Sequence, residues 1–168
     1  MTRPAIVALG VEDHHLLAHL QSQCFPDPWG VDGVARTASL SGTFGLIVRV
    51  TAAGKRVAAG FALARVVADE AELLTIGVLP AWRGQGLAGR LLSAVLTRAV
   101  ALGATRMLLE VAEDNAAARA LYARRNFEIV GRRPGYYRRS PQPAINALIL
   151  RWSKPADTGF NLRADIKK

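Results

Sequence analysis

The sequence predicts a single α/β (α+β) domain in which helices cover a β-sheet. Its 168 residues are long enough for one domain with a buried core, and 51% of them are hydrophobic, as in a globular protein. Segments with helix-like and strand-like spacing of apolar residues follow one another from residue 11 to residue 152. In the middle of the chain, a glycine-rich turn links an apolar strand to an amphipathic helix.

The first half of the chain contains two predicted helices followed by three predicted strands. Leu16, Leu17 and Leu20 are spaced to face a core from a helix over 11–23, which Pro26 and Pro28 prevent from continuing. A second, short helix is expected over 31–40. Strands are expected over 44–50, 56–67 and 72–78, the first two joined by a turn at 53–55.

The second half begins with a helix over 86–102 that carries an apolar stripe. Leu87, Leu91, Val95 and Ala99 form the stripe, with Leu92 and Leu102 beside it. A strand over 107–112, a helix over 116–125 and strands over 127–137 and 145–152 follow. We therefore expect a domain over 1–152 and a C-terminal tail of low order over 153–168, with Phe160 as its sole aromatic residue.

The glycine-rich turn has the features of an anion site. Gly84, Gly86 and Gly89 allow positive φ angles and a close approach of the backbone, and the N–H groups of the first helical turn point to the same place. A pyrophosphate fits such a turn. The same glycines also fit a strand-to-helix connection that serves only to turn the chain.

Two other nucleotide sites can be compared with this turn. A P-loop needs Lys followed by Ser or Thr, whereas Gly89 is followed by Arg90 and Leu91, so that site is excluded. The glycines do match Gly-x-Gly-x-x-Gly of dinucleotide sites, with Glu110 at 21 residues beyond Gly89. That motif usually opens a domain at its first strand, and here it lies in mid-chain.

Two blocks of sequence resemble the GNAT acetyltransferase superfamily. Arg83-x-x-Gly86-x-Ala88 is similar to its acyl-CoA signature, Gln/Arg-x-x-Gly-x-Gly/Ala, and residues 109–127 resemble its block Leu-Glu-Val-x-x-x-Asn-x-x-Ala-x-x-Leu-Tyr-x-x-x-Gly-Phe. Shorter segments at 25–29, 69–71 and 132–137 are similar to the RimI-type branch, the ribosomal-protein alanine N-acetyltransferases. The resemblance covers residues 5 to 152 and implies the GNAT fold, a central mixed, mostly antiparallel twisted sheet flanked by helices.

The resemblance also implies acetyl-CoA as cosubstrate and no metal. Backbone N–H groups of residues 76–78 would hold the pantetheine amides, with Val78 as the expected oxyanion donor. Asn115 would contact the pantetheine arm, although its side chain can also cap the following helix. The expected acyl-CoA-binding residues are Ile76, Gly77, Val78, Arg83, Gly84, Gln85, Gly86, Leu87, Ala88, Gly89, Arg90, Asn115 and Arg119.

Two residues of the second block are the expected catalytic groups. Glu110 lies in an apolar strand, where a carboxylate is costly unless it is paired or has a function. By resemblance Glu110 is the general base, acting through water, and Tyr122 gives a proton to the CoA sulfur. A Glu paired with an Arg and a Tyr that packs in the core are the alternatives. Glu72, which we place on the same alternation as Leu74 and Ile76, is the reserve base.

The acceptor implied by the resemblance is a protein N-terminus, the N-terminal alanine of a ribosomal protein, acetylated by direct attack in a ternary complex. Three residues depart from the family pattern. Asn126 replaces a Gly and suits a left-handed helix end, Gly135 replaces an Asn, and Asn146 replaces an Asp near the expected peptide end of the site. These departures keep open a lysine or small-molecule amine as acceptor, and a non-catalytic acyl-CoA-binding or RNA-associated protein.

Charge and composition limit compartment and partners. The net charge of +9 lies wholly in residues 119–168, which fits a negatively charged partner but equally a solvated basic face, so direct nucleic-acid binding is not favoured. The chain has no run of 18 apolar residues and no hydrophobic leader, which predicts a cytoplasmic protein without membrane contact. One cysteine, Cys24, excludes an internal disulfide, and His14, His15 and His19 are expected on the surface. The oligomeric state stays undetermined.

Overall fold

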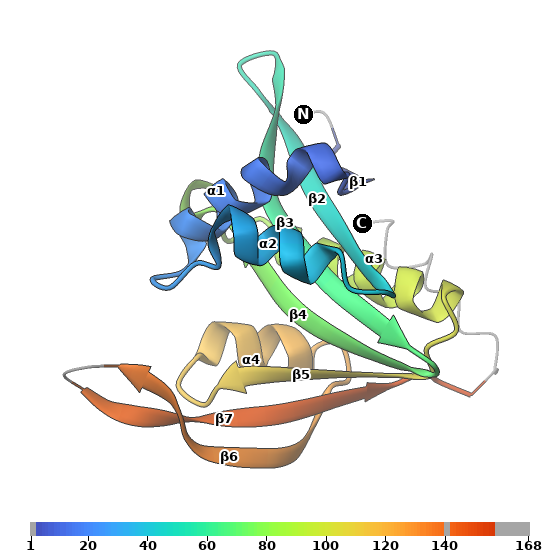
Figure 1. The fold of residues 1–168 in the computed structure, drawn as a ribbon, viewed down its shortest axis with the longest axis vertical. Coiled ribbons are helices and arrows are strands. Elements are labelled where there is room, and N and C mark those ends of the chain that lie inside the picture. Colours follow the sequence, from blue (N-terminus) through green and yellow to red (C-terminus); the bar gives the residue numbers. More distant parts are fainter. Residues whose placement is uncertain (1–2, 140–141, 157–168) are drawn as a thin grey trace.

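A computed structural model describes residues 3–139 and 142–156. Its seven strands form one sheet in the order β1-β2-β3-β4-β5-β7-β6 (Figure 1). All neighbouring strands are antiparallel except β4 and β5, which confirms the mixed, mostly antiparallel sheet. In chain order the elements are β1 (Ala5–Ala8), the 3-10 turn η1 (Val11–Asp13), α1 (His14–Cys24), α2 (Gly30–Ala38), β2 (Thr43–Ala52), β3 (Lys55–Val67), β4 (Glu70–Val78), the 3-10 turn η2 (Pro80–Trp82), α3 (Leu87–Ala101), β5 (Arg106–Ala112), α4 (Ala116–Ala123), β6 (Glu128–Arg139) and β7 (Gln142–Ser153).

The parallel strands β4 and β5 diverge soon after they begin. Their pairing runs from Glu70 opposite Arg106 to Glu72 opposite Leu108, although β4 extends to Val78 and β5 to Ala112. Arg106 ties the paired end together, because its Nε lies 2.7 Å from an oxygen of Glu70 and its Nη1 lies 3.2 Å from Asp69. Figure 1 shows the two strands separating from this point. The backbone of the second half of β4 is therefore not paired with β5.

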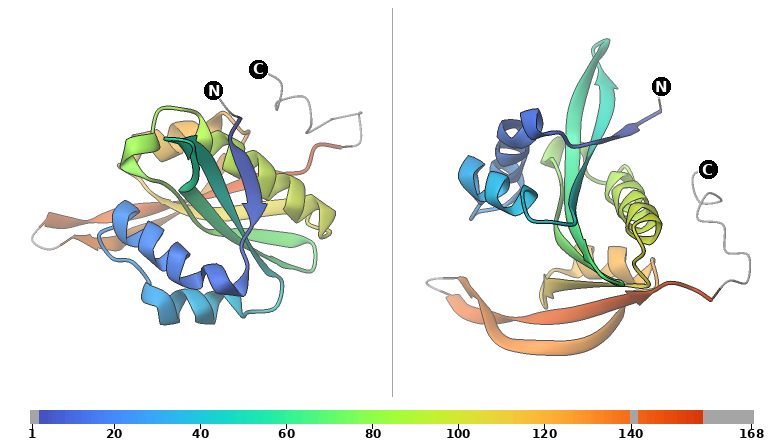
Figure 2. Two further views of the ribbon diagram at one scale, coloured as in Figure 1. Left: turned by 90° about the horizontal axis from the view of Figure 1, so that it is seen from above. Right: turned by 45° about the vertical axis from the view of Figure 1, so that its right-hand side comes forward.

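Helices cover the two faces of the β2–β4 part of the sheet from opposite sides (Figure 2). On one face, α3 buries Leu87, Leu91, Val95 and Ala99 against the strands, as the stripe predicts. On the other, α1 and α2 pack a smaller cluster that includes Leu17, Leu20, Val34, Phe61 and Leu63. Burial of these apolar side chains holds the N-terminal end of α3 in place beside the end of β4.

Several boundaries differ from the sequence-based expectations. The four-residue strand β1 was not predicted, because so short an edge strand has little periodicity to detect. The first helix starts with a 3-10 turn, and α1 proper begins at His14. The expectation for Leu102 was wrong: it is 42% exposed, because α3 ends at Ala101 and Gly103 turns the chain at a φ of +101°. Asn126 does adopt the expected left-handed conformation, with φ +61°.

A β-bulge in β4 overturns the expected alternation of Glu72, Leu74 and Ile76. Leu73 pairs with Ala64 and Thr75 with Leu63, so Leu74 is an extra residue in β4. An extra residue shifts every later side chain to the other face of the strand. Leu74 accordingly packs with the α1–α2 cluster, whereas Ile76 packs with the α3 cluster. Glu72 stays exposed at the end of the paired segment.

Candidate acyl-CoA site

The end of β4 presents backbone groups on the side from which β5 has departed. The N–H of Leu79 donates to Ala59 O of β3 at 2.9 Å. Because backbone groups alternate sides along a strand, the N–H groups of Ile76 and Val78 point away from β3. The Val78 carbonyl also points away from β3, since it accepts a hydrogen bond of 3.0 Å from Nε of Arg83, outside the sheet. Residues 76–78 therefore offer an extended backbone edge to a chain of amides.

The glycine-rich turn follows η2 and leads into α3. Gly84 and Gly86 have φ angles of +75° and +74°, and no atom lies within 4 Å of where a side chain would begin at either residue. Gly86 is the N-cap residue of α3, so the free N–H groups of the first helical turn lie directly behind the turn. Leu87 is buried and anchors this end of the helix, while Arg83 and Gln85 are exposed. The turn is thus open and has the backbone conformation of an anion cradle.

The first turn of α3 is held by a residue that the sequence did not single out. Nε of Arg125, just after α4, donates to Oγ of Ser93 at 3.0 Å, and its Nη2 donates to the Gly89 carbonyl at 3.4 Å. A side chain at Gly89 would begin 3.3 Å from that guanidinium. Arg125 therefore connects the glycine-rich turn to α4. Gly89 serves this contact and not a left-handed turn, because it has no positive φ angle.

Glu110 lies on β5, two residues beyond the last pair with β4. Its neighbours Leu109 and Val111 pack in the α3 core, so the carboxylate points to the opposite face of the sheet. There it forms an ion pair with Arg133 of β6, with 3.1 Å between Oε1 and Nη1. The side chain of Glu110 is 25% exposed, so the carboxylate is reachable. Glu110 is thus paired with an arginine, which was the alternative to a catalytic role. The ion pair uses Oε1 and leaves Oε2 of Glu110 free of that contact.

Tyr122 lies on α4 and is 5% exposed. Its ring packs at 5.6 Å from the ring of Phe127. Burial, together with a smaller electrostatic effect of Tyr137 of β6, raises the pKa of Tyr122 to about 12. The phenol is therefore neutral throughout the physiological range and is able to donate a proton.

Asn115 and Arg119 both hold the turn between β5 and α4. Asn115 is the N-cap of α4, and its Oδ1 accepts a hydrogen bond of 3.1 Å from the N–H of Ala118. Arg119 donates from Nη1 to the Glu113 carbonyl at 2.9 Å. Arg83 and Arg119, the expected phosphate partners, are each exposed and each bonded to a backbone carbonyl.

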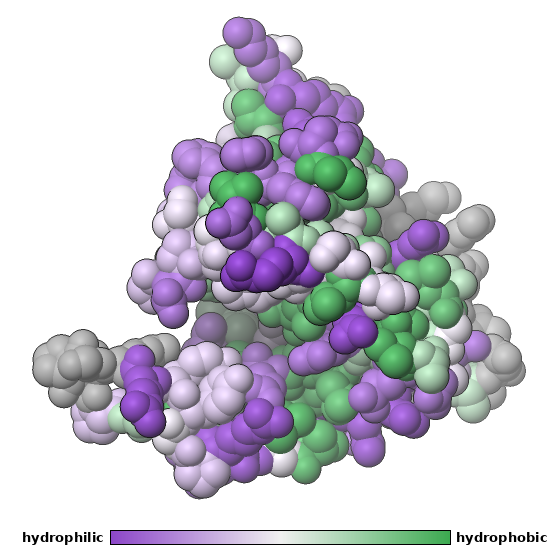
Figure 3. Space-filling view, in the orientation of Figure 1, coloured by the Kyte–Doolittle hydropathy of each residue, from purple (hydrophilic) through white to green (hydrophobic). Residues whose placement is uncertain are grey.

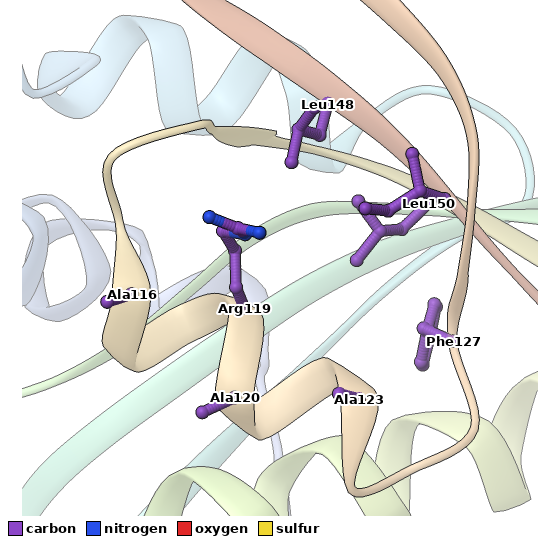
Figure 4. A pocket seen from close by; sticks show the side chains of 8 residues that line it. Ala116, Arg119, Ala120, Ala123, Phe127, Leu148 and Leu150 are labelled. Atoms are coloured by element: carbon purple, nitrogen blue, oxygen red, sulfur yellow. The ribbon is translucent and has the colours of Figure 1, made fainter.

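A cavity of about 540 Å³ lies between α4 and strands β6 and β7 (Figure 4). Its lining is almost entirely apolar, and Arg119 is the one residue it shares with the expected acyl-CoA set. The cavity therefore lies beside the candidate site and not within it. Residues that line it include Ala116, Arg119, Ala123, Phe127, Leu148 and Leu150.

On the opposite side of the sheet, the surface is hollowed between the part formed by α1 and α2 and the part formed by β6 and β7 (Figure 3). Strand β6 carries two adjacent tyrosines: Tyr136 is 49% exposed, and its ring meets that of Tyr137 edge-on, with 5.1 Å between centroids. Within 3–139 and 142–156, no group of three metal-ligating side chains occurs. The helices in those same ranges are all too short or too polar to cross a bilayer.

The model of the acetyltransferase (GNAT) family matches residues 14–127. With the diverging strands and the glycine-rich turn, this match assigns the chain to the GNAT acetyltransferase family.

Within the family, the chain is similar to two bacterial enzymes. It is 38% identical over 142 residues to the N-alpha-acetyltransferase RimI of Mycobacterium tuberculosis, covering 82% of this chain and 87% of that protein. It is 34% identical over 132 residues to the ribosomal protein bS18-alanine N-acetyltransferase of Escherichia coli, covering 79% and 86%. The crystal structure of the E. coli enzyme superimposes with a TM-score of 0.81 over 95% of this chain and 99% of that one, at 28% identity.

Some of the other matches cover less of the relative or are more distant. Alignments to three further curated relatives span 62%, 36% and 62% of those proteins. Arabidopsis thaliana NAA60, crystallised with acetyl-CoA, shares the fold with a TM-score of 0.78 over 90% of this chain and 98% of that one, at 17% identity. The expected family and fold are confirmed by these comparisons.

Proposed function

We propose that this protein is an acetyl-CoA-dependent N-acetyltransferase that modifies a protein N-terminal α-amine, the N-terminal alanine of a ribosomal protein. The observation that carries the proposal is the divergence of β4 and β5 after Glu72 and Leu108. The divergence leaves the N–H groups of Ile76 and Val78 unpaired with β5 on one strand, and the carboxylate of Glu110 on the other. The open glycine-rich turn follows the end of β4.

The described residues suit the pyrophosphate and pantetheine parts of acetyl-CoA. The turn at Gly84 and Gly86 has room for a pyrophosphate, because nothing lies within 4 Å of where a side chain would begin. The backbone edge at Ile76 and Val78 suits the pantetheine amides in the manner of an added strand. Asn115, Arg83 and Arg119 complete the proposed binding set. The two arginines, which now donate to backbone carbonyls, would donate to the phosphates of the cofactor instead.

Each step of the transfer has a candidate group. Glu110 accepts a proton from the attacking amine, directly or through water. An α-amine has a pKa of about 7.7 to 8.0 and lysine about 10.4, so a modest base suffices for an N-terminus. The Val78 N–H donates to the carbonyl oxygen as it gains charge. The new C–N bond forms as the C–S bond breaks, and the buried phenol of Tyr122 protonates the leaving sulfur.

The acceptor class rests on the similarity to enzymes named for N-alpha and bS18-alanine acetylation. A ribosomal-protein acceptor places the reaction in the cytoplasm. Lysine and small-molecule amines, which Gly135 and Asn146 left open, become alternative outcomes of the test.

Turnover of acetyl-CoA with a panel of short peptides tests the proposal. The panel varies the first residue, and one peptide has a blocked N-terminus and a single lysine. We expect preference for a free N-terminal alanine. Turnover of only the blocked lysine peptide, or of polyamines alone, would contradict the acceptor, and no turnover with any amine would contradict the enzyme assignment.

A further inference from the structure

Asn146 faces a large irregularity in the β6–β7 hairpin. Arg133 pairs with Ala147 and Tyr137 pairs with Ile145, so the three residues 134–136 of β6 lie opposite the single residue Asn146. Within this bulge, Gly135 has a φ of +60°, a conformation that glycine adopts without strain. The bulge adds length to β6 without adding a partner on β7.

The Asn146 side chain uses both of its polar ends. Its Oδ1 accepts a hydrogen bond of 3.0 Å from the N–H of Gly135, inside the bulge. Its Nδ2 donates to Oε2 of Glu113 at 2.6 Å. The backbone adds a third link, from the N–H of Glu113 to the Asn146 carbonyl at 2.9 Å. One amide therefore connects the β6 bulge to the turn that follows β5.

Glu113 is the charged partner of Asn146. Arg132 of β6 donates to the same Oε2 at 2.7 Å. Hydrogen bonds from Arg132 and Asn146 hold the pKa of Glu113 below its usual range, so it is a carboxylate at neutral pH. An aspartate at position 146, as in the family pattern, would place a second carboxylate against Glu113 with no proton to donate. The amide at 146 and the acid at 113 therefore form a matched pair.

The bulge fixed by this pair carries residues that reach both candidate catalytic groups. Arg133, at its start, contacts Glu110, and its guanidinium lies 5.6 Å from the ring centroid of Tyr136. Tyr137, at its end, acts electrostatically on Tyr122. Tyr136, in the middle, is 49% exposed and lies against the same Arg133 that contacts Glu110. A shift of the bulge would thus move Arg133 and Tyr136, the side chains nearest to the face of Glu110 that an acceptor must reach.

We propose that Asn146 and Glu113 form an acceptor-positioning unit, which sets the conformation of the 134–136 bulge and thereby the fit of the peptide acceptor. The inference rests on the proposed function. Both residues act through the bulge, so their loss should affect the acceptor and leave the binding of acetyl-CoA unchanged.

The test is a charge swap measured with wild-type protein and three variants. Asn146→Asp removes the donor to Glu113, and Glu113→Gln removes the negative charge that strengthens this hydrogen bond. Each should raise KM for the alanine-terminated peptide about tenfold, with little change in KM for acetyl-CoA. The double variant Glu113→Gln with Asn146→Asp restores a donor facing a carboxylate with the roles reversed. Its peptide KM should return to within about threefold of wild type, because coupled residues are not additive.

Asn126→Asp and Glu128→Gln make the same chemical changes at exposed positions outside the unit and should leave both KM values unchanged. An unchanged peptide KM in the single variants would overturn the inference while the proposed function stands. The same holds if the increase in peptide KM of the double variant equals the product of the two single increases. A wild-type protein that acetylates no peptide would overturn the proposed function and this inference together. Thermal denaturation of each variant identifies any that owes its KM to misfolding.

Discussion

Arg133 reaches across strand β7 to place its guanidinium 3.1 Å from the carboxylate of Glu110. The two residues lie on strands that are not neighbours, since β7 separates β5 from β6. The contact holds the carboxylate on the face of the sheet opposite α3, the face at which we propose that the acceptor amine is deprotonated. This geometry makes the roles of individual groups separable by mutation.

Glu110→Gln should abolish most turnover and leave acetyl-CoA binding intact. The amide cannot accept the proton of the amine, and loss of a general base costs about 10²- to 10⁴-fold in rate. The measurement is kcat/KM with the preferred peptide, together with the dissociation constant for acetyl-CoA by calorimetry. Glu128→Gln on the exposed surface of β6 is the control. Retention of full activity would remove Glu110 from the mechanism.

Tyr122→Phe should lower kcat with little effect on acetyl-CoA affinity. Thiolate is a fair leaving group because the pKa of a thiol is about 8.5, so the loss should be smaller than for Glu110→Gln if amine deprotonation limits the rate. Steady-state kinetics and equilibrium binding on the same protein separate the two effects. A large loss of binding would show that the ring serves packing against Phe127 and not proton transfer.

The buried phenol of Tyr122 also predicts a loss of stability in alkali. Its pKa of about 12 in the folded protein exceeds the ordinary value of 10, so the folded state holds this proton more tightly than the unfolded chain. The contribution is fully present below pH 10 and is lost as the pH rises toward 12, by roughly 1 to 3 kcal/mol. Urea unfolding at a series of pH values should show a steeper fall for wild type than for Tyr122→Phe. Parallel curves would contradict the assignment of this proton to Tyr122.

Gly84→Ala should weaken acetyl-CoA binding through the loss of space at the turn. Gly54, in the β2–β3 hairpin, provides a matched control: both glycines have a φ of +75°, and neither has an atom within 4 Å of where a side chain would begin. An alanine costs about 1 to 2 kcal/mol of folding free energy at either left-handed position. Both variants should therefore lose similar stability in denaturant titrations, and Gly84→Ala alone should raise KM for acetyl-CoA. Equal KM values would place the pyrophosphate elsewhere.

Much of the fold could be predicted because its signals are local. The stripe from Leu87 to Ala99 predicts the face that α3 buries, and Asn126 has a residue type suited to the left-handed helix end where it is found. The failures are also physical. β1 is too short for a periodic pattern, and the bulge at Leu74 depends on the register of β3, which the sequence of β4 does not contain.

Some residues of the candidate site could likewise be found from the sequence, and others only from the structure. The glycines, Glu110, Asn115 and Tyr122 could be selected from the sequence because they fall in two compact motifs. Arg125, Arg133 and the role of Glu113 could not, because each acts through a contact with a distant segment, as with Asn146 and Glu113 at a separation of 33 residues.

The sequence by itself determined the family and the order of most elements, and it supplied the candidate residues for acyl-CoA chemistry, since these depend on short-range spacing and residue type. The tertiary structure alone decided which arginine meets Glu110, and that Asn146 links Gly135 to Glu113. The reason is that partner choice follows from strand order and register. These are set by packing of the whole domain and not by any one segment.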